Sequence, residues 1–159
     1  MQKMIIKKVD RIEKKYNIER EYFKMVNRES VFGQEDDEKM IRVGIIGATG
    51  YAGGELVRLL INHKEAEIKW YGSRSYVDKK YADVYQNFFQ IVDDKCMDDN
   101  MEALANEVDV IFTATPQGLC ASLVNEDILN KVKIVDLSAD FRIKDVNTYE
   151  EWYKIEHKS

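Results

Sequence analysis

The chain has 159 residues, 45% of them hydrophobic and 33% charged, and a net charge of −5 at pH 7. This length suits one well-packed domain but not a nucleotide-binding domain with a full substrate domain. The acidic balance argues against nucleic-acid binding, and no apolar run reaches membrane-spanning length. Two well-separated cysteines, Cys96 and Cys120, fit neither a disulfide framework nor a metal site, so we expect a cytoplasmic protein without a metal.

Residues 1–39 are predicted to be a helical extension followed by an acidic linker. Residues 1–28 lack Gly and Pro and repeat apolar residues at heptad spacing, as at Ile5 and Ile12, which predicts a helix with a narrow apolar seam. The acidic run 35–38 is typical of a linker. Two interpretations of the helix stay open, a solvated extension of its own domain and part of a dimer zipper.

From Met40 onward, short apolar strands alternate with amphipathic helices, which predicts a parallel α/β sheet with helices on both faces. The predicted strands cover 42–46, 68–71, 108–114 and 133–137. The predicted helices cover 53–62, 101–106, 119–129 and 148–153. Between 77 and 99 the pattern is weak, and the residues expected to pack there are Tyr81, Tyr85, Phe88 and Phe89.

A glycine-rich turn joins the first predicted strand to the first predicted helix. Gly47, Gly50 and Gly53 follow the apolar run 43–46 at the spacing G-x-x-G-x-x-G. Glycines allow a tight turn and a close backbone approach to a pyrophosphate, and the helix N-terminus attracts the anion. We therefore predict a Rossmann-type domain over 40–159, preceded by the helical extension. Its predicted cofactor-binding loop is Gly47, Ala48, Thr49, Gly50, Tyr51, Ala52 and Gly53.

The end of the second predicted strand indicates which dinucleotide binds. An NAD-binding domain places an acid about 20 residues beyond the glycines, where it binds the adenosine ribose. Here Ser73, Arg74 and Ser75 occupy that place, and a guanidinium between hydroxyls suits a phosphate monoester. The sequence therefore predicts NADP as the cofactor. The alternative is an exposed arginine in a polar turn.

Two more strand ends carry candidate binding residues. Thr115 and Pro116 follow the third predicted strand and are expected beside the nicotinamide half of the cofactor, the alternative being a purely structural turn. Arg142 follows the fourth strand and is suited to clamp a substrate phosphate or carboxylate. It is equally suited to pair with Asp140 or Asp145 on the surface.

Taken together, the segments 47–53, 73–75 and 137–142 closely resemble the N-acetyl-gamma-glutamyl-phosphate reductase family of arginine biosynthesis. The tail 149–157 is similar to that family too, so the resemblance runs from Met40 to the end of the chain. It implies NADPH-dependent reduction of an acyl phosphate, N-acetyl-glutamyl 5-phosphate, to a semialdehyde with release of phosphate. It also implies that Arg142 faces the acyl phosphate, and we expect a homo-oligomer.

One departure from the family concerns its nucleophile, a cysteine in an Asn-Pro-Gly-Cys-like motif that this sequence does not contain. Cys96 lies among acidic residues that disfavour a thiolate, and Cys120 lies in a predicted helix. We therefore assign no catalytic residue. We expect a nucleotide-binding part whose catalytic domain is absent and which is inactive alone.

The alternative function is a non-catalytic NADP-binding sensor or assembly module. Tyr76 and Lys80 match the spacing of the short-chain reductase pair, but they follow the second strand, too early for that site.

Overall fold

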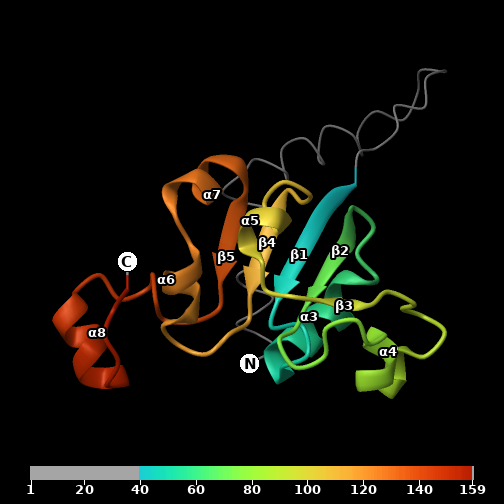
Figure 1. Ribbon diagram of the computed structural model, residues 1–159, viewed down its shortest axis with the longest axis horizontal. Helices are drawn as coiled ribbons and strands as arrows, with labels where there is room; N and C mark the ends of the chain where they lie inside the picture. Colours follow the sequence, from blue (N-terminus) through green and yellow to red (C-terminus); the bar gives the residue numbers. More distant parts are fainter. Residues whose placement is uncertain (1–39, 159) are drawn as a thin grey trace, which may run out of the picture. The chain divides into compact units, whose positions relative to one another are not determined.

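The computed structural model describes residues 40–158. The helical extension and acidic linker predicted for residues 1–39 lie outside the described residues. The described chain begins with β1 (Ile41–Ile46), α3 (Tyr51–Leu60), β2 (Ala66–Gly72), α4 (Tyr81–Val84), the 3-10 helix η1 (Gln86–Phe88) and β3 (Cys96–Met97). It continues with α5 (Met101–Leu104), β4 (Val110–Thr113), α6 (Leu119–Leu123), α7 (Glu126–Lys131), β5 (Lys133–Asp136) and α8 (Val146–Tyr153) (Figure 1).

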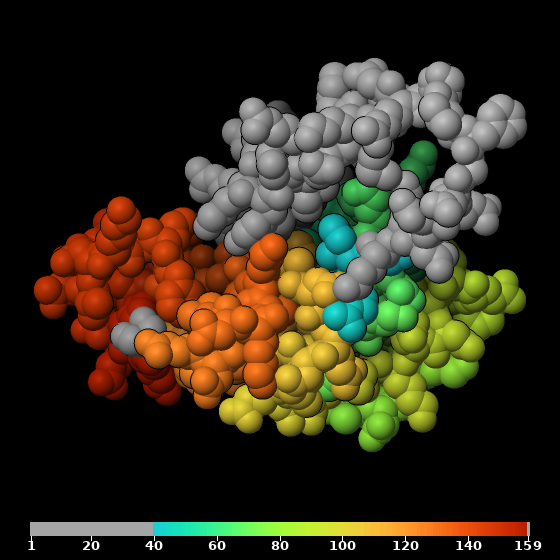
Figure 2. Space-filling model, turned by 90° about the horizontal axis from the view of Figure 1, so that it is seen from above, coloured from blue at the N-terminus to red at the C-terminus, as the bar shows by residue number. Residues whose placement is uncertain are grey.

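All five strands pair in parallel in the order β3-β2-β1-β4-β5. The chain starts at the centre with β1, builds outward through β2 and β3, and then crosses to β4 and β5 on the other side of β1. The strand order therefore reverses between β1 and β4, and ligands of open α/β sheets bind beyond the carboxyl ends of strands at such a point. Figures 1 and 2 show α4 and α8 at opposite ends of the described domain.

A buried apolar cluster joins the sheet to α5 and α7. It consists of Ile46, Trp70, Met101, Leu104, Ala105, Val108, Ile111, Ile128 and Val132. Gly44 makes room for this contact, because a Cβ at Gly44 would stand 2.5 Å from Cδ1 of Leu104. The indole N–H of Trp70 donates to the carbonyl of Asp98 at 2.9 Å, so the polar atom of this buried ring is satisfied.

The predicted parallel sheet is confirmed, and four of its five strands were expected near the observed positions. The single helix predicted over 119–129 is wrong, because α6 and α7 are separate. Asn125 is extended between them, with φ −138°, and its side chain accepts from the N–H of Ile128 to start α7. Phe89 is 69% exposed and does not pack as expected, and the pattern gave no sign of β3.

Within residues 40–158 no helix is long and apolar enough to cross a membrane.

Truncating Leu104 to alanine should lower the free energy of unfolding by about 2–5 kcal/mol, because the cluster loses apolar contacts and retains a cavity. Leu104 is fully buried, whereas Leu129 of α7 is 55% exposed and gives a matched control. Urea denaturation followed by circular dichroism measures both variants. A loss in Leu129→Ala as large as that in Leu104→Ala would contradict the assignment of the core.

Candidate nucleotide-binding site

Gly47, Gly50 and Gly53 play three different steric roles in the loop between β1 and α3. Gly47 has φ +80°, and a Cβ there would stand 2.5 Å from the Ala114 carbonyl oxygen. A Cβ at Gly53 would overlap the carbonyl oxygen of Gly47, so this residue lets α3 approach the loop. Gly50 is exposed, and its nearest neighbour would be 3.4 Å from an added Cβ. The backbone at Gly50 is therefore the part of the loop that a ligand can approach closely.

The N-terminus of α3 lies at this loop and favours an anion. The helix is ten residues long, its N-cap Gly50 has no side chain to cap it, and its first turn contains no acidic residue. The first turn of an α-helix leaves backbone N–H groups without intrahelical partners, and its dipole is positive there. Both features suit a pyrophosphate placed at the carboxyl end of β1.

Two tyrosine hydroxyls hold the carbonyl groups of the glycine loop. Tyr81 donates to the Ala48 carbonyl at 2.9 Å, and Tyr85 lies 3.1 Å from the Thr49 carbonyl oxygen and 3.2 Å from that of Gly50. Their rings are in contact, tilted by 35° with centroids 5.5 Å apart, and burial raises the pKa of both hydroxyls. These hydrogen bonds satisfy the carbonyl oxygens of Ala48, Thr49 and Gly50. From the sequence, Tyr81 and Tyr85 were expected only to pack, and their hydrogen bonds to the loop were not predicted.

The structure brings the segment Ser73-Arg74-Ser75 to the glycine loop. Ser73 is 2% exposed, and its Oγ lies 2.7 Å from Oγ1 of Thr49, so two separately predicted motifs meet in one hydrogen bond. Ser75 is exposed. The Arg74 side chain is 60% exposed, and its Nε donates to Oδ2 of Asp99 at 2.7 Å. The sequence analysis missed Asp99, which lies 25 residues further along the chain.

The loop after β4 lies against the same glycines. Thr115 is half-buried, and its Cγ2 lies 3.4 Å from the position of a Cβ on Gly47. Its buried Oγ1 has no hydrogen-bond partner in the part of the chain that the structure describes. Pro116 is exposed. A buried hydroxyl without a partner costs free energy, so a polar ligand group at this loop would be favoured.

Arg142 is exposed and, within residues 40–158, forms no ion pair. The two carboxylates that could have paired with it have other hydrogen bonds. Asp145 accepts from the N–H of Thr148 at the start of α8, and Asp140 is buried. The guanidinium of Arg142 therefore remains available to a ligand.

Asp140 connects the loop after β4 to the loop after β5 and to α8. Its carboxylate accepts from the N–H of Gly118 at 2.8 Å, the N–H of Ala121 at 3.1 Å and the hydroxyl of Tyr149 at 2.8 Å. Burial alone raises the pKa of Asp140, but these hydrogen bonds outweigh burial, so the pKa lies below its ordinary value of 3.8. The ionised carboxylate thus stabilises the loop that carries Thr115.

Asp140→Asn should lower the free energy of unfolding at pH 7 by about 2 kcal/mol, because buried donors lose a charged acceptor. A lowered folded-state pKa means that the stabilisation is full above the unfolded value, near 3.8, and is lost as the pH falls through the folded value. Urea unfolding at several pH values should therefore show the difference shrinking below about pH 4. Asp127→Asn, at an exposed site, is the control. A difference that persists undiminished at pH 3 would contradict this role.

The two cysteines are poor nucleophiles where they lie. Both are buried and free. Burial raises the pKa of Cys96 and raises that of Cys120 to about 12, so neither is a thiolate at neutral pH. Within the described range no group of three or more His, Cys, Asp or Glu side chains is placed to hold a metal ion.

Comparison with known proteins places the described domain in a family. Residues 42–155 match the family model of the semialdehyde dehydrogenase NAD-binding domain. The chain is 78% identical over 120 residues to the N-acetyl-gamma-glutamyl-phosphate reductase of Lachnospira eligens, covering 76% of this chain and 34% of that protein. The enzyme of the same name from Lachnoclostridium phytofermentans is 72% identical, with 76% of this chain and 35% of that protein covered.

A solved structure shares the fold. The aspartate semialdehyde dehydrogenase of Candida albicans, determined with NADP, superposes with a TM-score of 0.54 at 23% identity, covering 68% of this chain and 32% of that one. The chain spans about a third of the length of the curated relatives that it matches. Because residues 42–155, more than half of the chain, match its model, the chain belongs to the semialdehyde dehydrogenase family, NAD-binding domain.

Proposed function

We propose that residues 40–158 bind NADPH for the reduction of an acyl phosphate. The observation that carries the proposal is the exposed Arg74 beside the glycine loop, to which the Ser73–Thr49 hydrogen bond ties it. In this arrangement the N-terminus of α3 and the loop 47–53 hold the pyrophosphate. Ser73, Arg74 and Ser75 bind the phosphate on the adenosine ribose, since a guanidinium binds phosphate in preference to a bare hydroxyl.

The other strand-end loops serve the reacting end of the cofactor in this proposal. Thr115 and Pro116 lie beside the nicotinamide half, where the Thr115 hydroxyl, which has no partner in the described part of the chain, supports a polar contact. When bound, NADPH supplies the hydride that reduces N-acetyl-glutamyl 5-phosphate, the substrate class that the names of the relatives indicate. Arg142, which has no ion pair with any residue of 40–158, then orients the acyl phosphate.

The chain's own part in this reaction is binding and orientation. Both of its cysteines are buried with raised pKa values, so neither supplies the thiolate that attacks an acyl phosphate. We propose that the domain binds NADPH without turnover of acyl phosphate. Steady oxidation of NADPH by the purified chain, dependent on acyl phosphate, would contradict this assignment.

Arg74→Ala should weaken NADPH binding by about 10- to 100-fold, the loss of charged hydrogen bonds to one phosphate. NADH, which lacks that phosphate, should lose much less. Isothermal titration calorimetry with both nucleotides measures the two constants. Arg58→Ala is the matched control, because Arg58 is an exposed cation that pairs with Glu55 near the far end of α3. Equal losses for NADPH and NADH would remove the assignment of Arg74.

Tyr85→Phe should weaken NADPH and NADH to the same degree, by about three- to tenfold, because the loop carbonyls lose their hydrogen bond while the ring remains. Both nucleotides carry the pyrophosphate, so the effect should not depend on the ribose phosphate. Tyr76→Phe removes a hydroxyl from a partly exposed tyrosine outside this loop and is the control. Unchanged affinities in Tyr85→Phe would show that the hydroxyl does not hold the loop for binding.

A further inference from the structure

Asp99 places a carboxylate at the carboxyl end of β2, although it belongs to another segment. It comes two residues after β3, the strand that pairs with β2 at the sheet edge. Its Oδ1 lies 3.3 Å from the position that a Cβ on Gly72, the last residue of β2, would occupy. In an NAD-binding domain the acid that binds the adenosine ribose stands at this strand end. In this chain, Asp99 reaches the same strand end from the segment after the neighbouring strand β3.

Only one of the two carboxylate oxygens of Asp99 accepts a hydrogen bond from residues 40–158. Oδ2 accepts from Nε of Arg74, whereas Oδ1 is buried and has no partner among residues 40–158. An ionised carboxylate has about four acceptor positions, so it can accept from a hydroxyl without losing Arg74. The side chain is 12% exposed, and a buried acceptor without a donor costs free energy that a hydroxyl would recover.

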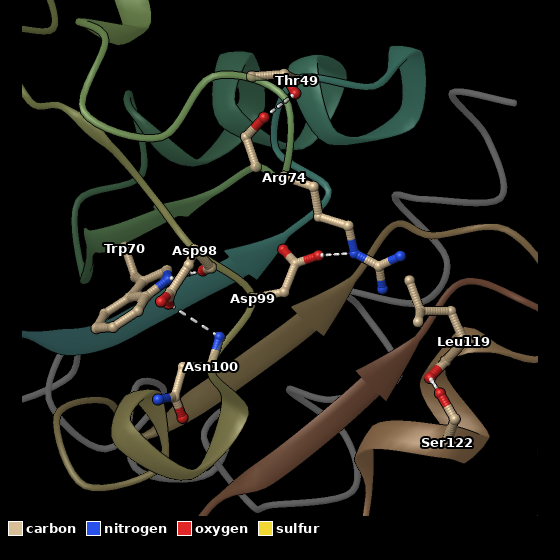
Figure 3. A network of polar contacts seen from close by, with 9 residues as sticks. Thr49, Trp70, Arg74, Asp98, Asp99, Asn100, Leu119 and Ser122 are labelled. Atoms are coloured by element: carbon tan, nitrogen blue, oxygen red, sulfur yellow. Dashed lines mark hydrogen bonds and ion pairs between the residues drawn. The ribbon is translucent and has the colours of Figure 1, made fainter.

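The two forms of the adenosine ribose present opposite chemistry to this carboxylate. A free 2′-hydroxyl donates a hydrogen bond, which a carboxylate accepts strongly. A 2′-phosphate donates none and carries negative charge, which a carboxylate repels. Figure 3 shows the two terminal nitrogens of Arg74 turned away from Asp99, so the guanidinium can bind a phosphate on its far side. At the end of β2, Arg74 thus favours the phosphorylated ribose of NADPH, and Asp99 favours the free hydroxyl of NADH.

We infer that Asp99 is a specificity-determining residue that accepts from the unphosphorylated ribose and so limits the preference for NADPH over NADH. This inference rests on the proposed nucleotide site. It makes the domain an NADPH binder that also accepts NADH, with Arg74 and Asp99 setting the ratio. If Asp99 served only to hold Arg74 in place, its removal would weaken NADPH and leave NADH unchanged, the reverse result.

The test compares NADPH and NADH binding to the full chain by isothermal titration calorimetry, for the unchanged protein and for Asp99→Ala and Asp99→Asn. In Asp99→Ala, NADH should weaken about tenfold, the loss of one charged hydrogen bond, while NADPH stays equal or tightens. Asp99→Asn keeps the size and one acceptor oxygen, so the ratio should shift in the same direction by a smaller factor. Asp93→Ala removes the aspartate of an exposed Lys80 pair of the same 2.7 Å length and is the matched control.

Binding of two nucleotide fragments, ADP and 2′-deoxy-ADP, tests whether Asp99 acts through the 2′-hydroxyl. ADP should lose affinity in Asp99→Ala, and 2′-deoxy-ADP, which lacks the hydroxyl, should bind both proteins alike. Loss of NADPH affinity as large as that of NADH, or equal losses for the two fragments, would overturn the inference. If Arg74→Ala still selectively weakens NADPH while both Asp99 variants leave the ratio unchanged, the inference fails and the proposed function stands. If the unchanged protein binds neither nucleotide, the proposed function itself fails.

Discussion

The close contact between α3 and the end of β1 is the constraint on which the site depends. Gly53 lies so near the Gly47 carbonyl that any side chain would overlap it, and Gly47 adopts a positive φ that other residues rarely adopt. With these two residues in place, the N-terminus of α3 lies over the strand end. Gly54 adds to the arrangement, because a Cβ there would stand 3.1 Å from the ring of Tyr85, whose hydroxyl binds the loop carbonyls.

Features that are continuous in the sequence could be predicted from it. A strand buried on both faces requires an unbroken apolar run, and β1 and β4 are such runs, with all of β4 buried. The glycine loop and the segment 73–75 are each contiguous, and their strand-end position follows from parallel pairing. The sequence could therefore place both segments at strand ends, and the Thr49–Ser73 hydrogen bond shows that they meet there.

Features that depend on distant residues could not be predicted in the same way. Tyr85 reaches the Thr49 carbonyl across 36 positions, and Asp99 reaches Arg74 across 25, so no local pattern marks either contact. The short strand β3, which carries Asp99 to the site, has only two residues and lacks a period that a sequence pattern can show. The break between α6 and α7, by contrast, could have been predicted from the sequence. Asn125 before two acidic residues is a helix-start signal.

Asp140 and Asp99 both lie beyond the carboxyl ends of strands, but they differ in how many hydrogen bonds their carboxylates accept. Asp140 receives two backbone N–H groups and a tyrosine hydroxyl, so it has little capacity left and stabilises the loops around it. Asp99 receives one guanidinium N–H and keeps a buried oxygen that has no donor among residues 40–158. A folded chain gains nothing from such an oxygen unless a further group supplies the donor. Asp99 lies at the end of β2, where the inferred site would place a ribose hydroxyl that supplies this donor.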